Sequence, residues 1–220
     1  MEMERHILVV LPHPDDEAFG ISGTLAGHIR QGTPVTYACL TLGEMGRNMG
    51  NPLAANRVTL PEIRKAELEE SCRSIGIQDL RMLGFHDKTI EFEDRELLVG
   101  KIRELIDELN PSLVITFYPG YSVHPDHDAT GAAVIDTVQR IPVEERPVVH
   151  CIAFSKGCED VLGKADVVND VRPYLGQKLG SILAHSSQFQ LNGQLGGKSA
   201  NDKEVQERFG YERLWTYRFQ

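Results

Sequence analysis

The chain has 220 residues, of which 41% are hydrophobic and 25% are charged, and its formal net charge at pH 7 is −9. These values are typical of a globular protein with a single domain, which we place at residues 1–220. No stretch reaches the roughly 18 uninterrupted apolar residues of a membrane-spanning helix, and an acidic surface does not neutralise phosphates, so we expect neither a membrane nor a nucleic acid as a partner.

Strand patterns and helix patterns alternate along the chain. Runs of apolar residues predict buried strands, and apolar residues spaced three and four apart predict helices. The predicted strands are residues 6–12, 34–42, 79–85, 112–118 and 148–155, and the predicted helices are residues 18–31, 61–76, 94–110, 127–140 and 172–185. Two irregular segments, residues 43–60 and 187–203, are long enough to predict lids or specificity loops.

Continuously apolar strands that are separated by helices predict a Rossmann-like, doubly wound α/β fold. In such a fold, helices cover both faces of a mostly parallel sheet. Ligands bind beyond the carboxyl ends of the strands. The glycine-rich dinucleotide fingerprint is absent after the first predicted strand, and the sequence HPDDE stands in its place.

The HPDDE sequence occupies residues 13–17. Acids at the start of a helix are stabilised by the helix macrodipole, so capping alone would account for Asp15, Asp16 or Glu17. Capping does not account for His13, whose imidazole stands where ligands of this fold class bind. We expect Glu17 to support the helix start or the site without taking part in the chemistry.

A second cluster, HPDH at residues 124–127, also follows a predicted buried strand and precedes a helix. Because the carboxyl ends of parallel strands meet at one edge of a sheet, we predict that both clusters form one metal site. Two imidazoles and a carboxylate suit Zn²⁺ with water as the fourth ligand, and they also suit ferrous iron. One of the adjacent aspartates would bind the metal and the other would act as a base, and the spacing does not say which.

The two motifs, with IRKAELEESCRSIGI between them and LAHSSQF near the end, resemble the LmbE/PIG-L family of zinc-dependent N-acetylglucosamine deacetylases. The resemblance covers nearly the whole chain in the order expected for the family. It implies a hydrolase that releases acetate from an N-acetylglucosaminyl compound, a small-molecule glycoside.

The resemblance implies a role for each residue of the two motifs. The implied zinc ligands are His13, Asp16 and His127. Asp15 is the implied general base. His124 is implied to assist the tetrahedral intermediate as an electrophile or acid, and Asp126 to orient His124.

The implied substrate contacts are Arg64 of IRKAE, Asp87 of GFHDK and Tyr121, which stands three residues before the HPDH histidine where relatives often have a tyrosine two before it. Arg47 and Arg57 add cationic groups that suit a carboxylate-bearing substrate, although exposed arginines also pair with surface acids.

The loop GEMGRNMGNP most resembles that of the bacillithiol-biosynthesis deacetylases, which implies N-acetylglucosaminyl L-malate as the substrate. Three alternatives stay open at this point. They are a deacetylase acting on chitin fragments, an amidase acting on thiol S-conjugates, and a sugar-binding module without catalysis.

The N-terminal sequence MEMERHILVV has neither a basic leader nor a small-residue cleavage site, so we expect a cytoplasmic protein. The aromatic end LWTYRF suits a homo-oligomer as well as packing within the chain, and we expect a homo-oligomer. Among the remaining histidines, His86 and His185 stand near the implied site, whereas His6, His28 and His150 fit surface or core positions.

Overall fold

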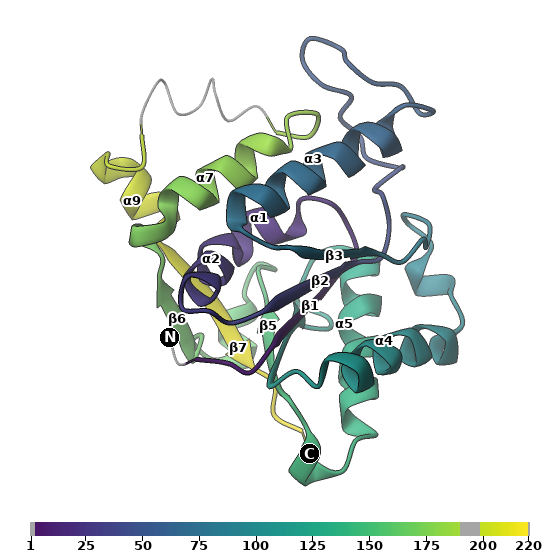
Figure 1. The fold of residues 1–220 in the computed structure, drawn as a ribbon. Coiled ribbons are helices and arrows are strands. Elements are labelled where there is room, and N and C mark those ends of the chain that lie inside the picture. The colour runs from purple at the N-terminus through teal and green to yellow at the C-terminus, as the bar shows by residue number, and fades with distance from the viewer. Residues whose placement is uncertain (1–2, 190–198, 220) are drawn as a thin grey trace.

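A computed structural model of the chain describes residues 3–189 and 199–219. In this part of the chain, seven strands form one sheet in the order β3-β2-β1-β4-β5-β7-β6 (Figure 1). The strands are β1 (Ile7–Leu11), β2 (Val35–Cys39), β3 (Asp79–Met82), β4 (Leu113–Phe117), β5 (Val148–Ile152), β6 (Val167–Asp170) and β7 (Tyr211–Thr216). Strands β1 to β5 pair in parallel, and β7 lies antiparallel between β5 and β6. The predicted mostly parallel sheet is confirmed.

Helices cover both faces of this sheet. The α-helices are α1 (Asp16–Gly20), α2 (Ser22–Arg30), α3 (Leu60–Ile75), α4 (Arg95–Leu109), α5 (Pro125–Gln139), α6 (Cys158–Leu162), α7 (Leu175–Ala184) and α9 (Lys203–Phe209). Short 3₁₀ helices are η1 (Ile90–Phe92), η2 (Val143–Glu145) and η3 (Arg172–Tyr174). Helices α3 and α7 lie side by side over one face, and α4 and α5 pack together on the other (Figure 1).

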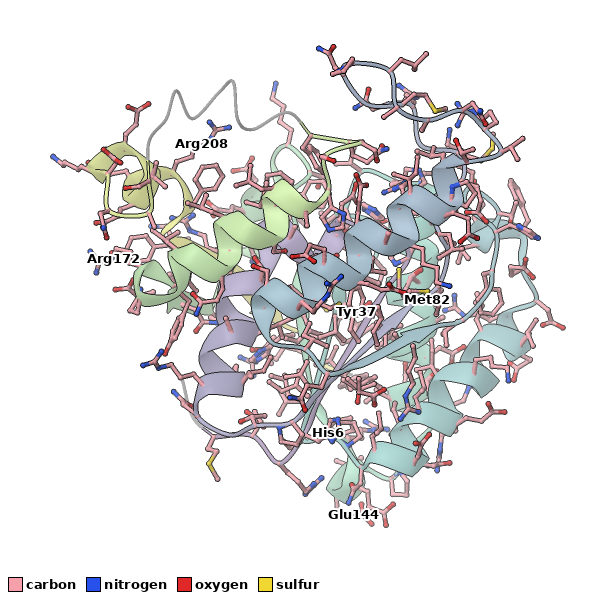
Figure 2. The ribbon with its side chains drawn as sticks, turned by 45° about the horizontal axis from the view of Figure 1, so that its top comes forward. His6, Tyr37, Met82, Glu144, Arg172 and Arg208 are labelled. Carbon is pink, nitrogen blue, oxygen red and sulfur yellow. The ribbon has the colours of Figure 1, made fainter. Side chains whose placement is uncertain are left out.

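Strand β1 shows why helices must pack on both faces of the sheet. All five of its residues are fully buried, and successive side chains point to opposite faces. Ile7, Val9 and Leu11 join the core under α2 and α3, whereas Leu8 and Val10 join the core under α4 and α5. Tyr37 of β2 is also fully buried in the first core, beneath α3 (Figure 2).

The helix that was predicted at residues 18–31 is two helices, and this prediction is wrong. The break falls at Ile21, between α1 and α2. The first N–H groups of α2 are capped from a distant strand, because the carboxylate of Glu212 accepts hydrogen bonds from Gly23 (3.0 Å) and Thr24 (2.7 Å). A cap that comes from the other end of the chain leaves no local signal in the sequence.

The C-terminal part of the chain contains elements that we did not predict, namely α6, β6, α9 and β7. Strand β7 alternates exposed and buried residues from Tyr211 to Leu214, and the buried side chains of Leu214 and Trp215 both pack within this chain. The predicted 187–203 loop falls partly outside the described residues. Among the residues that are described, no helix is long and apolar enough to cross a membrane, and the homo-oligomer stays a prediction.

The strand order reverses between β1 and β4, and ligands of this fold class bind at such a reversal. From β1 the chain continues to β2 and β3 on one side, and then returns to β4 and β5 on the other. Parallel pairing of β1 with β4 brings their carboxyl ends together at this reversal. HPDDE follows β1 and HPDH follows β4, so both motifs lie at this edge.

Candidate metal and catalytic site

The three predicted metal ligands converge at the edge where β1 and β4 end. His13 Nδ1 lies 3.2 Å from His127 Nε2 and 3.5 Å from Asp16 Oδ2. His127 Nε2 lies 3.1 Å from Asp16 Oδ1. His13 and His127 are 114 positions apart in the chain, yet their imidazole nitrogens and the Asp16 carboxylate meet at one point.

Neighbouring groups fix the tautomer of both histidines. His127 Nδ1 donates to the carbonyl of Ser122 (2.9 Å), which leaves its Nε2 with a lone pair. His13 Nε2 faces the carboxylates of Asp126 and Asp87, each at 3.2 Å, so the neutral ring carries its proton on Nε2 and has its lone pair on Nδ1. Metal-ligating histidines commonly have their second nitrogen held in this way, so the donor set fits a divalent cation.

The charges around the histidines also favour a cation. Desolvation alone would lower the pKa of His13 and of His127, but the nearby carboxylates, Asp16 foremost, raise both pKa values. Burial would raise the pKa of Asp16, but the two imidazoles hold it far below its usual range. Other groups here have ligand atoms within 4.8 Å of one another, namely His13 with His124 and His127, and His13 with Asp87 and Asp126.

Asp15 stands beside this cluster in an unusual backbone conformation. Its φ is 108°, a value that non-glycine residues rarely adopt and that costs about 1–3 kcal/mol where the surroundings impose it. Arg64 Nη2 donates to Asp15 Oδ2 (2.9 Å). Burial raises the pKa of Asp15 to about 7, with Asp16 adding to the rise and Arg64 opposing it. A carboxylate with such a pKa is suited to exchange protons near neutrality.

Glu17 holds the backbone of Asp15 by a hydrogen bond. Its fully buried carboxylate accepts from the Asp15 N–H (3.1 Å), the Ser71 hydroxyl (2.5 Å) and Tyr37 Oη (3.3 Å). His185 Nε2 lies 2.7 Å from the same carboxylate and is also fully buried. Glu17 and His185 therefore lie behind the site, whereas His86 is exposed beside Glu44.

His124 and Asp126 lie at the start of α5. His124 caps the helix, and its Nδ1 accepts from the Asp126 N–H (3.1 Å). The neutral ring therefore carries its proton on Nε2. Desolvation, with His13 and His127 nearby, lowers the pKa of His124. The Asp126 carboxylate contacts His13 and accepts from the Lys88 N–H (2.6 Å), so its polar partners include His13 rather than the His124 ring.

A polar cavity of about 290 Å³ opens over these groups. Arg47, Arg64, Asp87 and Lys88 line it together with His13, Asp15, Asp16, His124 and His127. Arg64 is almost fully buried and donates to the carbonyls of Gly43 and Pro14 as well as to Asp15. Gly43 has a φ of 63°, and a β-carbon there would collide with the Arg64 guanidinium.

Two predicted substrate residues do not line this cavity. Arg57 Nη1 donates to the carbonyls of Glu44 (3.2 Å) and Gly46 (2.6 Å) and so braces the loop after β2. Tyr121 packs edge-on against Tyr118, with ring centroids 5.6 Å apart. The structure therefore brings Arg47, Arg64 and Asp87 to the site and leaves Arg57 and Tyr121 outside it.

Several site residues carry no signal in the sequence motifs. The Ser122 carbonyl and the Lys88 N–H act through the backbone, so their residue types do not reveal them. The HSS sequence of LAHSSQF, in contrast, is a motif whose residue types do indicate a role beside the site. The Glu67 carboxylate accepts hydrogen bonds from the Ser187 N–H (2.7 Å) and from both serine hydroxyls. These bonds hold Gln188 at the cavity.

Comparisons with known proteins identify the family of this chain. The family model PIG-L, described as GlcNAc-PI de-N-acetylase, matches residues 8–138. A Bacillus cereus protein named "Probable N-acetyl-alpha-D-glucosaminyl L-malate deacetylase 2" is 51% identical, with 99% of this chain and 100% of that protein covered. A Bacillus subtilis protein of the same name is 49% identical, with 99% of each chain covered.

Among solved structures, N,N'-diacetylchitobiose deacetylase from Pyrococcus horikoshii superimposes with a TM-score of 0.73. The match covers 97% of this chain and 84% of that one, at 24% identity, and it supports the fold alone. The family match spans both HPDDE and HPDH, and the two Bacillus relatives match over almost their full length. The chain belongs to the PIG-L family of de-N-acetylases.

Proposed function

We propose that this chain removes the N-acetyl group of N-acetylglucosaminyl L-malate and releases acetate and the free amine. The observation that carries the proposal is the convergence of His13, Asp16 and His127 within 3.5 Å of one another, beside Asp15. The names of the two Bacillus relatives supply the substrate.

We assign His13 Nδ1, His127 Nε2 and the Asp16 carboxylate as the groups that would hold a zinc ion. Bound zinc supplies Lewis acidity to the acetyl carbonyl and lowers the pKa of water in the site. Asp126 and Ser122 keep the two imidazoles oriented for this role. Iron in the ferrous state would find the same ligands.

Asp15 acts as the general base in this proposal. Its carboxylate takes a proton from the attacking water and returns one to the leaving amine nitrogen. Arg64 fixes the position of the carboxylate and Glu17 fixes its backbone N–H, so the base needs little reorganisation. The raised pKa makes both transfers accessible near neutral pH.

His124 stabilises the negative charge that develops on the acetyl oxygen. Its Nδ1 is committed to the Asp126 N–H, so Nε2–H is the donor that remains. The lowered pKa keeps the ring neutral, and a neutral ring still donates this hydrogen bond.

The polar cavity supplies groups for the sugar and the malate. Arg47 is exposed at its rim, and Lys88 stands on the same lining, so a dicarboxylate meets two cations in an otherwise acidic protein. Asp87 would accept a hydrogen bond from a sugar hydroxyl.

A substrate panel tests the proposal. Acetate release should be at least about tenfold faster, as kcat/KM, from N-acetylglucosaminyl L-malate than from free N-acetylglucosamine or diacetylchitobiose, because only the first carries carboxylates for the cations. Arg47→Gln should reduce this preference, whereas Arg30→Gln, on α2, should keep it. Equal rates on all three substrates would reject recognition of malate.

A further inference from the structure

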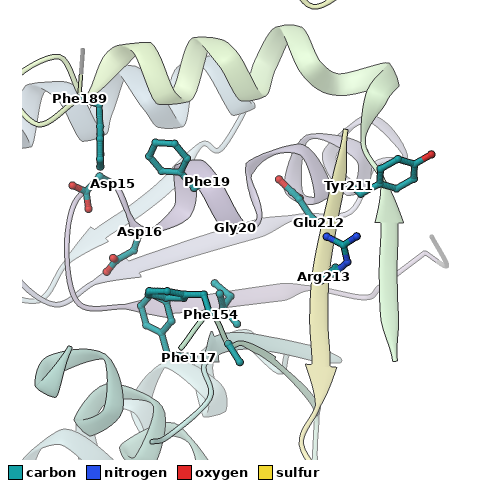
Figure 3. A pocket seen from close by; sticks show the side chains of 12 residues that line it. Asp15, Asp16, Phe19, Gly20, Phe117, Phe154, Phe189, Tyr211, Glu212 and Arg213 are labelled. Carbon is teal, nitrogen blue, oxygen red and sulfur yellow. The ribbon is translucent and has the colours of Figure 1, made fainter. Parts of the chain in front are cut away.

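A second cavity adjoins the site, and its chemistry is different. It measures about 480 Å³ and shares Asp15 and Asp16 with the polar cavity. Phe19, Phe117, Phe154 and Phe189 line the part beside these aspartates, and Arg213 stands at the far end (Figure 3).

The aromatic lining continues from the metal site itself. The Phe117 ring stacks on His127, with centroids 3.9 Å apart, and contacts Phe154 at 6.0 Å. On the opposite wall, Phe19 of α1 meets Phe189 edge-on at 4.8 Å. An apolar group that enters between these walls would therefore lie within reach of the reacting centre.

Two of these aromatic side chains are exposed. The exposed fraction is 38% for Phe19 and 53% for Phe154. Exposed phenylalanines that face one another across a cavity commonly mark a binding site for an apolar group. Neither side chain is needed to fill the core of the sheet.

The geometry of a secondary amide indicates which part of a substrate would enter this cavity. Such an amide is planar and trans, so the sugar carbon on nitrogen and the chain on the carbonyl carbon leave in opposite directions. If the sugar and its carboxylates occupy the polar cavity with Arg47 and Lys88, the acyl chain points past Asp15 and Asp16 into the apolar cavity. An acetyl group offers only a methyl group to this space.

We propose that the apolar cavity is an acyl-chain site and that the protein hydrolyses glucosaminides whose N-acyl group is a longer alkyl or arylalkyl chain. The inference rests on the proposed function. Water adds its oxygen to the carbonyl carbon, the C–N bond breaks, and both protons of the water pass to the nitrogen, so the products are the longer carboxylate and the amine in its ammonium form.

The test compares N-acetyl, N-butyryl, N-hexanoyl and N-phenylacetyl derivatives of glucosaminyl L-malate, with release of the free amine as the readout. Each added methylene that leaves water favours binding in an apolar site, so kcat/KM for the hexanoyl compound should exceed that for the acetyl compound by about tenfold or more. A steady fall in kcat/KM from acetyl to hexanoyl would overturn the proposal.

Variants connect the preference to the cavity. Phe154→Ala and Phe19→Ala should each lower the hexanoyl-to-acetyl ratio of kcat/KM about tenfold. Phe92→Ala is the matched control, because Phe92 is 78% exposed on η1 and lies outside the cavity. An unchanged ratio in both cavity variants would reject the acyl-chain site.

A second series varies the aglycone instead, with methyl, benzyl and octyl glycosides of N-acetylglucosamine. If apolar aglycones raise kcat/KM and Phe154→Ala removes this increase, the cavity binds the aglycone, and its assignment as an acyl-chain site is wrong. If the protein deacetylates the malate glycoside but kcat/KM does not rise with longer acyl chains, only this inference is refuted. No amine release from any malate derivative refutes the proposed function as well.

Discussion

Asp15→Asn should hydrolyse N-acetylglucosaminyl L-malate about 10²–10⁴-fold more slowly than the unaltered protein, because an amide cannot accept the proton of the attacking water. Asparagine tolerates a positive φ, and its side-chain oxygen can still accept from Arg64, so the local backbone should persist. Metal content should be unchanged, since the three assigned ligands remain. Acetate release at saturating substrate, with metal quantified in the same preparation, measures both quantities.

Asp107→Asn is the control for this substitution. Asp107 pairs with Arg103 on the exposed face of α4 and lines neither the polar nor the apolar cavity. The control should keep full activity. If Asp15→Asn kept full activity too, the assignment of the base would be wrong, and if it lost its metal, Asp15 would belong to the ligand set.

The predicted strands follow from burial, and the predicted helices follow from burial together with local capping signals. A strand such as Ile7–Leu11, which is buried on both faces, must be apolar throughout, and this leaves a clear pattern. Helix α4 begins at the Asp94 cap and ends at Asn110 in a left-handed conformation before Pro111, which are local signals. The edge strand β6 is only half buried and leaves no such pattern.

The sequence predicts those site residues that directly follow the carboxyl end of a strand. His13 and His127 meet because β1 and β4 are neighbours with the same direction, which the alternating pattern implies. Loop geometry carries no comparable rule, so the sequence does not reveal that Arg57 braces a loop. The apolar cavity draws its phenylalanines from four separate segments, and no spacing between them repeats a known motif.

Lys178→Met should lower the free energy of unfolding by about 3–5 kcal/mol, because it leaves a buried carboxylate without its cation. Lys178 and Glu212 are each 2% exposed, and Nζ lies 2.5 Å from the carboxylate. The ammonium also donates to the Phe19 carbonyl (2.7 Å), so one side chain ties α7 to α1 and β7. Urea denaturation at neutral pH measures the loss.

Two further variants make this result specific. Lys203→Met removes an exposed lysine that pairs with Glu207, and its stability should change by no more than about 0.5 kcal/mol. The double variant Lys178→Met/Glu212→Gln should be more stable than Lys178→Met alone, because it removes the unpaired charge. A loss below about 1 kcal/mol in Lys178→Met would show that the pair is not desolvated in solution.

Metal dependence is the central claim, and it is tested most directly by removing the metal with a chelator and titrating zinc back while acetate release from N-acetylglucosaminyl L-malate is followed. The metal-free protein should release no acetate, and activity should return in proportion to added zinc up to one equivalent per chain. His127→Ala, which removes an assigned ligand, should show little recovery over the same range. Undiminished acetate release by the metal-free protein would contradict the account.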